Sequence, residues 1–326
     1  MDLKPSLLTL ALAACACGGP QDDAPEPALP SFDAQSTDAV QSERVLSPLE
    51  ARRDYLTQWS RCLMRTGSQL ERSWARLEQD IDVDKLRVRA KGIKPFFDAV
   101  DGELLDACPL GTPPPADVAP TIATRGRAYV LATRGYGNRA KELRQYFDTE
   151  GYVTDAWAQL KDDLPAQKDA YDAAHAAEQA FAAELEGAQD AADGLWLDAL
   201  AANGGAQSAA WHVTNTALHG RATRHCVSEQ RPLPEACTDA HEAFTAARDG
   251  LLQWQRAHQA DAVGVFWLDV FGKRAEALEE ALAGLSAPLS RRKKTAEAEL
   301  AAAAARVAEA RAALQMAANT VVFDFP

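Results

Sequence analysis

Apolar side chains recur at intervals of three, four and seven residues over most of this 326-residue chain. Residues at this spacing lie on one face of an α-helix, so each run predicts a helix that buries one face. Regular alternation of apolar and polar residues between turn dipeptides is absent from the sequence, apart from a short extended tail at Val321–Phe325. The sequence therefore predicts an all-α fold, an elongated bundle of long antiparallel helices with no substantial sheet.

Capping residues and prolines set the expected helix boundaries. Ser47, Pro48 and Glu50 form a capping box with proline at the first helical position, which predicts a helix that reaches about Asp80. The prolines of residues 109–120 predict a loop. Further helices are expected at Pro95–Ala107, Ala119–Phe147, Trp157–Asn203, Ala206–Val227, Pro234–Gln259 and Ala262–Leu285.

Two of the expected helices have distinctive patterns. In the segment from Trp157, the sequence Asp163-Leu164-Pro165 predicts a break or restart, with Asp163 capping the new helix. At the C-terminus, an apolar residue every seventh position predicts a long helix, and the alanines between them allow neighbouring backbones to approach closely. These positions are Leu300, Val307, Leu314 and Val321.

The first 14 residues have the pattern of an export signal. Lys4 precedes an apolar run from Leu7 to Ala14, which is too short to span a bilayer. The run ends in Leu12-Ala13-Ala14-Cys15, which resembles a bacterial lipobox. This resemblance implies cleavage before Cys15, lipid on its thiol and, with Ala16 in the next position, sorting to the outer membrane. The alternatives are an ordinary secretory signal, or Cys17 as a second, poorer site.

Residues 15–46 are rich in Pro, Asp, Ala and Ser and contain few large apolar groups, which predicts a flexible tether. A chain of this kind reaches roughly 5–6 Å times the square root of its residue number. The helical domain is expected to cover residues 47–326, with a sub-boundary near residues 203–206, where Asn203-Gly204-Gly205 stops a helix. The mature chain contains no apolar run long enough for a transmembrane helix.

The chain has a net charge of −13 and a pI of about 5.0. This acidic balance argues against a nucleic-acid partner, because neutralising phosphates requires a basic face. Arg291-Arg292-Lys293-Lys294 is the main basic cluster, and we interpret it as the solvated start of a helix rather than a lipid contact.

Four cysteines lie beyond the signal region: Cys62, Cys108, Cys226 and Cys237. In an oxidising envelope this even number indicates disulfides. Of the three pairings, Cys62–Cys108 with Cys226–Cys237 is favoured, because each bridge would join adjacent helices across a loop.

A metal site is the alternative for the second pair. His225-Cys226 and Cys237-x-x-x-His241 together offer two thiols and two imidazoles, and His212 and His219 lie upstream. Four such ligands suit tetrahedral zinc. The spacing matches no common zinc pattern, so no metal or other cofactor is predicted.

Catalytic signatures are absent from the sequence: there is no nucleophile elbow, phosphate-cradling loop or His-Glu-x-x-His helix. The adjacent carboxylates Asp162-Asp163 and Glu279-Glu280 would point about 100° apart on a helix, which suits solvated surface better than acid–base chemistry. Trp211, Trp254 and Trp267 are expected in the core. We therefore expect a protein that is not an enzyme.

One segment resembles a known family. Tyr146-Phe147-Asp148, Gly151-Tyr152 and Asp155 are followed by Tyr171, His175 and Phe181 on an alanine-rich helix, and Asn319 ends a helix near the C-terminus. This arrangement resembles the YiiG-like bacterial lipoproteins, a family with a domain of unknown function. The resemblance covers about Leu49 to Phe325 and implies no reaction.

The sequence favours an envelope lipoprotein anchored through Cys15 that acts as a non-catalytic interaction or scaffold module. Its expected partners are the membrane, through the lipid, and envelope proteins. The alternatives are a periplasmic small-ligand or metal-binding lipoprotein and a hydrolase.

Overall fold

The computed structural model describes residues 48–82, 85, 87–88, 99–203, 205–226, 235–259, 265, 267–285 and 293–321. For Arg87, Val88, His225, Ala236, Lys293 and Lys294 it describes the backbone alone. These residues all belong to one compact unit, Leu46–Pro326. The expected signal peptide, residues 1–14, and the expected tether lie outside the described residues.

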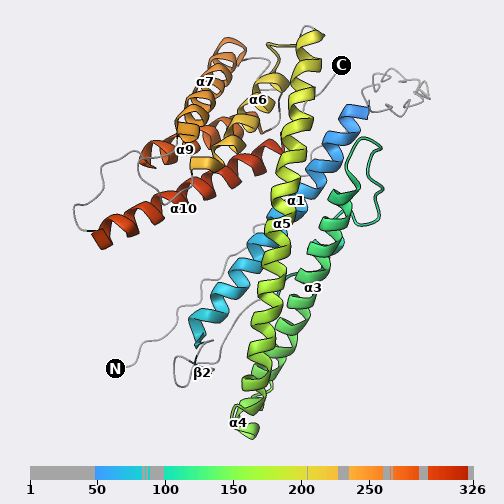
Figure 1. Cartoon of the computed structure of the whole chain (residues 1–326), viewed down its shortest axis with the longest axis vertical. Coiled ribbons are helices and arrows are strands. Elements are labelled where there is room, and N and C mark those ends of the chain that lie inside the picture. Colours follow the sequence, from blue (N-terminus) through green and yellow to red (C-terminus); the bar gives the residue numbers. More distant parts are fainter. Residues whose placement is uncertain are drawn as a thin grey trace, which may run out of the picture. The chain divides into compact units, whose positions relative to one another are not determined.

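The described chain is all-α, as predicted (Figure 1). Its one described sheet is a two-residue antiparallel ladder in which Ile81 pairs with Val88. The elements are α1 (Pro48–Asp80), β1 (Ile81–Asp82), β2 (Arg87–Val88), α2 (Gly102–Asp106), α3 (Pro120–Asp148), α4 (Gly151–Asp155), α5 (Ala158–Ala202), α6 (Ala209–Ala222), the 3-10 turn η1 (Thr223–Cys226), α7 (Glu235–Ala257), α9 (Leu268–Leu285) and α10 (Lys293–Ala318).

The first hydrophobic core lies between α1, α3 and α5. The short helix α4 reverses the chain between α3 and α5, so these two helices are antiparallel (Figure 1). On α1, Trp59 packs against Phe181 and Trp74 stacks on Tyr171, so α1 also runs antiparallel to α5. The buried stripe of α1 matches the sequence pattern and includes Tyr55, Leu56, Trp59, Leu70, Trp74 and Leu77.

The second core is formed by α6, α7, α9 and α10. Leu300, Val307 and Leu314 of the predicted seven-residue repeat are buried in it, whereas Val321 follows the end of α10 and is half-buried. The first core ends in sequence at Ala192 and the second begins at Val213. The sub-boundary expected near residues 203–206 lies between them.

A charged seam joins the two cores. The Arg221 side chain is only 4% exposed, and its Nε and Nη2 donate to Asp190 Oδ1 and Asp193 Oδ2, both at 2.7 Å. Arg53 on α1 donates to the other oxygen of Asp193 at 2.9 Å and lies over the Trp196 ring. Residues from α1, α5 and α6 therefore share one network of charges, in which Arg221 is buried and the others are half-buried.

The predicted break at Asp163-Leu164-Pro165 is wrong, because α5 runs without interruption and contains Pro165. Leu160 and Leu164 are both fully buried, so the apolar stripe continues through the proline and keeps the helix in place. The cap is supplied by Asp155 instead of Asp163. Its carboxylate accepts from the backbone N–H groups of Trp157 at 2.9 Å and Gln159 at 3.1 Å.

Two other boundaries differ from the predictions. The helix expected over Pro95–Ala107 is described only as α2, which starts at Gly102 because the Asp101 side chain accepts from Glu103 N–H. Trp267 precedes α9, has a φ of 67° and is 43% exposed, so its expected place in the core is wrong, whereas Trp254 is buried. Trp211 is half-buried.

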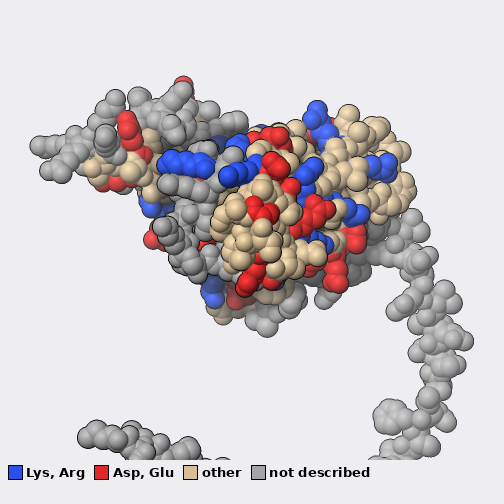
Figure 2. All heavy atoms as spheres, turned by 90° about the horizontal axis from the view of Figure 1, so that it is seen from below, with Lys and Arg blue, Asp and Glu red and all other residues tan. Residues whose placement is uncertain are grey.

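Acidic and basic side chains are interspersed on the face shown in Figure 2. The described residues form no large surface of one sign on that face. Within the described residues, no helix combines the length and apolarity needed to cross a bilayer.

Candidate metal centre

The four cysteines beyond the signal region lie in the two pairs expected from the sequence. The Cα atoms of Cys62 and Cys108 are 5.2 Å apart, and those of Cys226 and Cys237 are 4.6 Å apart, in each case with the sulfur atoms bonded. A bonded pair offers no thiolate, so Cys226 and Cys237 do not supply the metal ligands of the alternative hypothesis.

Among the described residues, the histidines of that hypothesis are not brought together with the sulfurs as a ligand set. His241 Nε2 lies 2.9 Å from Glu279 Oε1, which ties α7 to α9, and the His225 side chain lies outside the described residues. His212 is 6% exposed, and its two ring nitrogens form no hydrogen bond with the described residues. The pKa of His212 and that of His219 are lowered, in both cases mainly because burial disfavours the charged ring.

Glu71, His175 and Glu178 form a different cluster, between α1 and α5. Each residue places one potential ligand atom within 4.8 Å of the other two, and this is the one such set of three that the described residues contain. His175 and Glu178 are three residues apart on α5, so both side chains leave the same face of that helix. Glu71 faces them from α1.

Gly67 makes room for Glu178. A Cβ at Gly67 would overlap Glu178 Oε1, so any side chain at this position would displace the carboxylate from its place against α1. The pKa of Glu178 is raised, first because burial disfavours its anion and next because Glu71 is a nearby like charge, while His175 acts in the opposite direction. Two carboxylates and an imidazole thus converge at a half-buried point.

His175 is held by contacts on both sides of its ring. The ring stacks on Tyr171 with centroids 5.7 Å apart and planes at 7°, and Tyr171 in turn stacks on Trp74. Nε2 lies 2.9 Å from the Gln179 amide nitrogen, and Nδ1 lies 3.6 Å from Glu178 Oε2. Both Nδ1 and this Oε2 are buried atoms without a hydrogen-bond partner in the described chain.

A second layer of polar contacts supports the α1 side of the cluster. Thr66 lies next to Gly67, and its hydroxyl is 2.5 Å from the Tyr129 hydroxyl. Seven residues further along α1 and α3, the Ser73 and Tyr136 hydroxyls are 2.8 Å apart. Burial raises the pKa of Tyr136 to about 12, and that of Tyr129 is raised for the same main reason. Both phenols therefore stay neutral at physiological pH.

The arrangement has the chemistry of a divalent metal centre. Imidazole nitrogen with carboxylate oxygen is a common ligand set for zinc and neighbouring ions. The Gln179 amide stands at Nε2, where metal-bound histidines usually donate their second N–H to a neighbouring acceptor. The structure places the Gln179 amide nitrogen at Nε2. Exchanging the nitrogen and oxygen of this amide, which have nearly the same shape, would let the Nε2–H donate to the oxygen and leave the Nδ1 lone pair facing the carboxylates.

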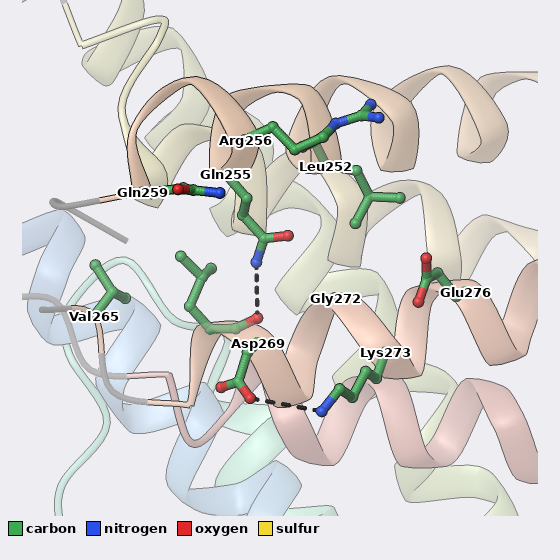
Figure 3. Close-up of a pocket in the computed structure, with 10 residues that line it drawn as sticks. Leu252, Gln255, Arg256, Gln259, Val265, Asp269, Gly272, Lys273 and Glu276 are labelled. Atoms are coloured by element: carbon green, nitrogen blue, oxygen red, sulfur yellow. Dashed lines mark hydrogen bonds and ion pairs between the residues drawn. The ribbon is translucent and has the colours of Figure 1, made fainter. Parts of the chain in front are cut away.

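A groove of about 760 Å³, lined by none of the three residues of the cluster, lies between α7 and α9 (Figure 3). Its described lining includes neither histidine nor cysteine, and Lys273 pairs with Asp269 at 3.8 Å. Gln255 donates to the Leu268 carbonyl at 3.1 Å. The polar groups of this groove are therefore partly satisfied by one another, and they do not converge on one point.

Sequence reasoning missed the cluster. His175 is named only in the family resemblance, although the His175-x-x-Glu178 spacing on a predicted helix indicates two potential ligands on one face. Glu71 has no local signal, because only the register between α1 and α5 brings it to the other two.

Comparisons of the chain with protein-family models, with curated protein sequences and with solved structures find no match. The resemblance to YiiG-like lipoproteins stays a prediction.

Proposed function

We propose that this protein is a lipid-anchored envelope protein that binds one divalent metal ion, without catalysis, through Glu71, His175 and Glu178. The observation that carries the metal-binding function is the convergence of three ligand atoms within 4.8 Å on two long helices. The buried His175 Nδ1 and Glu178 Oε2 support it, because they form no hydrogen bond with the described residues and face each other at 3.6 Å, whereas buried polar atoms normally have a hydrogen-bond partner.

The interaction or scaffold role favoured by the sequence stays a prediction. It rests on composition and on the absence of catalytic motifs in the sequence, whereas the ligand cluster favours a specific chemistry. We therefore place the metal-binding alternative first. Crosslinking in intact envelopes tests for protein partners of the scaffold role.

Zinc titration of the purified mature chain tests the metal-binding function. Calorimetry and elemental analysis after desalting should report one zinc ion per chain. His175→Gln and Glu178→Gln should each abolish stoichiometric binding while the far-ultraviolet circular dichroism stays helical.

His241→Gln and Glu279→Gln are matched controls, because they remove the same residue types from a pair that lacks a third ligand. Both controls should bind zinc like the wild type. Equal binding by the His175 and His241 variants, or no stoichiometric zinc in the wild type, would remove the basis for this function.

The membrane anchor rests on Cys15 and the apolar run before it. Several acyl chains on one cysteine hold a protein firmly, since each buried methylene contributes about 0.8 kcal/mol. Expression in a Gram-negative host with labelled palmitate should label the wild type and a Cys17→Ser variant and leave Cys15→Ser unlabelled. Label retained by Cys15→Ser would contradict the anchor and leave the metal site untouched.

A further inference from the structure

The ligand set between α1 and α5 limits the class of ion. It offers one nitrogen and two carboxylates, and this inference rests on the proposed metal-binding function. Calcium prefers six to eight oxygen ligands, and magnesium keeps most of its water and favours oxygen. Imidazole suits first-row transition ions such as zinc, iron and nickel. The donors therefore favour a first-row divalent ion over calcium or magnesium.

The number of ligands distinguishes a closed site from an open one. Structural zinc sites are held by four protein ligands, whereas sites with three protein ligands keep a position for an outside molecule. Among the described residues, the cluster contains three His, Cys, Asp or Glu side chains and no fourth. Since no other His, Cys, Asp or Glu of the described residues joins these three, the remaining coordination positions are open to water or to an incoming ligand.

The cluster has a closed side and an open side. On the closed side, Tyr171 covers the His175 ring and the α1 backbone at Gly67 lies against Glu178. Glu71 is exposed, whereas His175 and Glu178 are half-buried. An incoming ligand therefore meets Glu71 first, and Glu71 is the ligand that can leave without disturbing the packing of α5.

We propose that this is an exchangeable carrier site, which holds a first-row divalent ion and releases it to an acceptor that offers nitrogen or sulfur ligands. A donor atom of the acceptor bonds to the ion at the open position, and the bond to the Glu71 carboxylate then breaks. The oxidation state of the ion does not change. The remaining bonds to Glu178 and His175 break as the acceptor completes its own ligand set.

The disulfide and the helical core make this release independent of unfolding. Cys62 and Cys108 tie α1 to the end of α2, and the flanking layers Trp59–Phe181 and Trp74–Tyr171 hold α1 against α5 on both sides of the cluster. The ligands therefore stay in place when the ion leaves, as a carrier that is loaded repeatedly requires.

Rapid mixing of the zinc-loaded mature chain with a chromogenic nitrogen-ligand chelator tests the proposal. The release rate should rise in proportion to chelator concentration, because the chelator attacks the bound ion. A rate that does not depend on chelator concentration shows that the ion leaves by itself or through local opening, and it overturns the carrier site. Absence of stoichiometric zinc before mixing contradicts the proposed function instead.

Two variants sharpen the measurement. Glu71→Gln should retain zinc more weakly and release it several-fold faster at each chelator concentration, since its amide is a poorer ligand. Glu142→Gln, an exposed glutamate on α3, should match the wild type. Equal release from the Glu71 variant and the wild type would contradict the role of Glu71 as the leaving ligand.

Competition tests the ion class. Calcium or magnesium in hundredfold excess should leave the zinc bound, whereas cobalt or nickel should compete for the site. Displacement of zinc by an equal concentration of calcium would overturn the assignment to first-row ions. Circular dichroism of the metal-free chain should show the helical content of the loaded chain.

Discussion

Gly67 stands at the point where α1 comes closest to the Glu178 carboxylate, one helical turn before Glu71. Glycine is a poor helix former, about 1 kcal/mol less favourable than alanine in a helix interior. Its presence inside a 33-residue helix is explained by the space it leaves for Glu178. A residue that weakens the helix locally thus permits the ligand cluster.

Gly67→Ala tests this explanation. The new Cβ would displace the Glu178 carboxylate, so zinc affinity should fall by at least about tenfold, the size of effect seen when the support of a metal ligand is removed. Calorimetric titration measures the affinity. Gly135→Ala on α3 is the control, because a Cβ there would meet nothing within 4 Å. Unchanged affinity in the Gly67 variant would show that the overlap is relieved by a simple side-chain shift.

His212 makes stability depend on pH. The pKa of this buried imidazole is lowered, first by burial and then by repulsion from His258. The unfolded chain takes up the proton near pH 6.5, whereas the folded chain does so only at lower pH. The unfolded state therefore binds more protons in this window, and stability falls as the pH falls below about 6.5.

Urea denaturation at pH 7.5 and at pH 5.0 measures the effect of His212. The loss of stability between these two values should be smaller in His212→Leu than in the wild type. His219 contributes in the same direction, since burial also lowers its pKa. If His212→Leu lost as much stability as the wild type between pH 7.5 and pH 5.0, the pH dependence would belong to other groups.

At the scale of elements, α5 is the helix on which local rules and packing disagree. Pro165 lacks the N–H that would bond to the Lys161 carbonyl, yet the helix continues through it. Leu160 and Leu164 before the proline and Ala174 and Phe181 after it are all fully buried in the same core. Burial of this stripe outweighs the loss of one backbone hydrogen bond.

Pro165→Ala should therefore stabilise the protein. The alanine restores the hydrogen bond and removes the clash of the ring with the preceding turn, a gain partly offset by the greater freedom of the unfolded chain. We expect a net gain of about 1–2 kcal/mol in the free energy of unfolding, measured by urea denaturation. Pro120→Ala at the start of α3 should give no such gain, because a first-turn N–H has no partner in the helix. Equal effects at both positions would contradict the argument.

Some features of the fold follow from the local sequence, whereas others depend on contacts between distant residues. Leu300, Val307 and Leu314 are buried on one face of α10, as predicted. Their seven-residue spacing can be recognised from the sequence of this helix alone. The local apolar pattern does not predict that α2 starts at Gly102, because the Asp101 side chain caps the helix there. It also does not predict that Trp267 is exposed, because Trp267 itself has a positive φ. Glu71 lies near the other two proposed metal ligands only because α1 packs against α5, a helix far from it in the sequence.

At the scale of the molecule, two hydrophobic cores are joined by a seam of charges. Arg221 bonds to Asp190 and Asp193 on α5 and, through Nη1, to Gln315 on α10 at 3.0 Å. Its pKa is raised: burial opposes the charge, but the two aspartates more than compensate. α5 lines the first core and α10 the second, so this side chain links the packing of both.

Arg221→Ala should destabilise the whole unit by about 3–5 kcal/mol, because it leaves two aspartates without their buried partner. Denaturation followed by circular dichroism and by tryptophan fluorescence measures both the loss and its cooperativity. Arg224→Ala is the control: it removes a 3.2 Å ion pair to the same Asp190 from a more exposed position, and it should lower stability by no more than about 1 kcal/mol.

If the seam couples the cores, the wild type unfolds in one transition and the Arg221 variant in two, with the second core melting first because it contains fewer large aromatic contacts. A single transition at unchanged denaturant concentration in the Arg221 variant would show that apolar packing between α5 and α6 joins the cores without it.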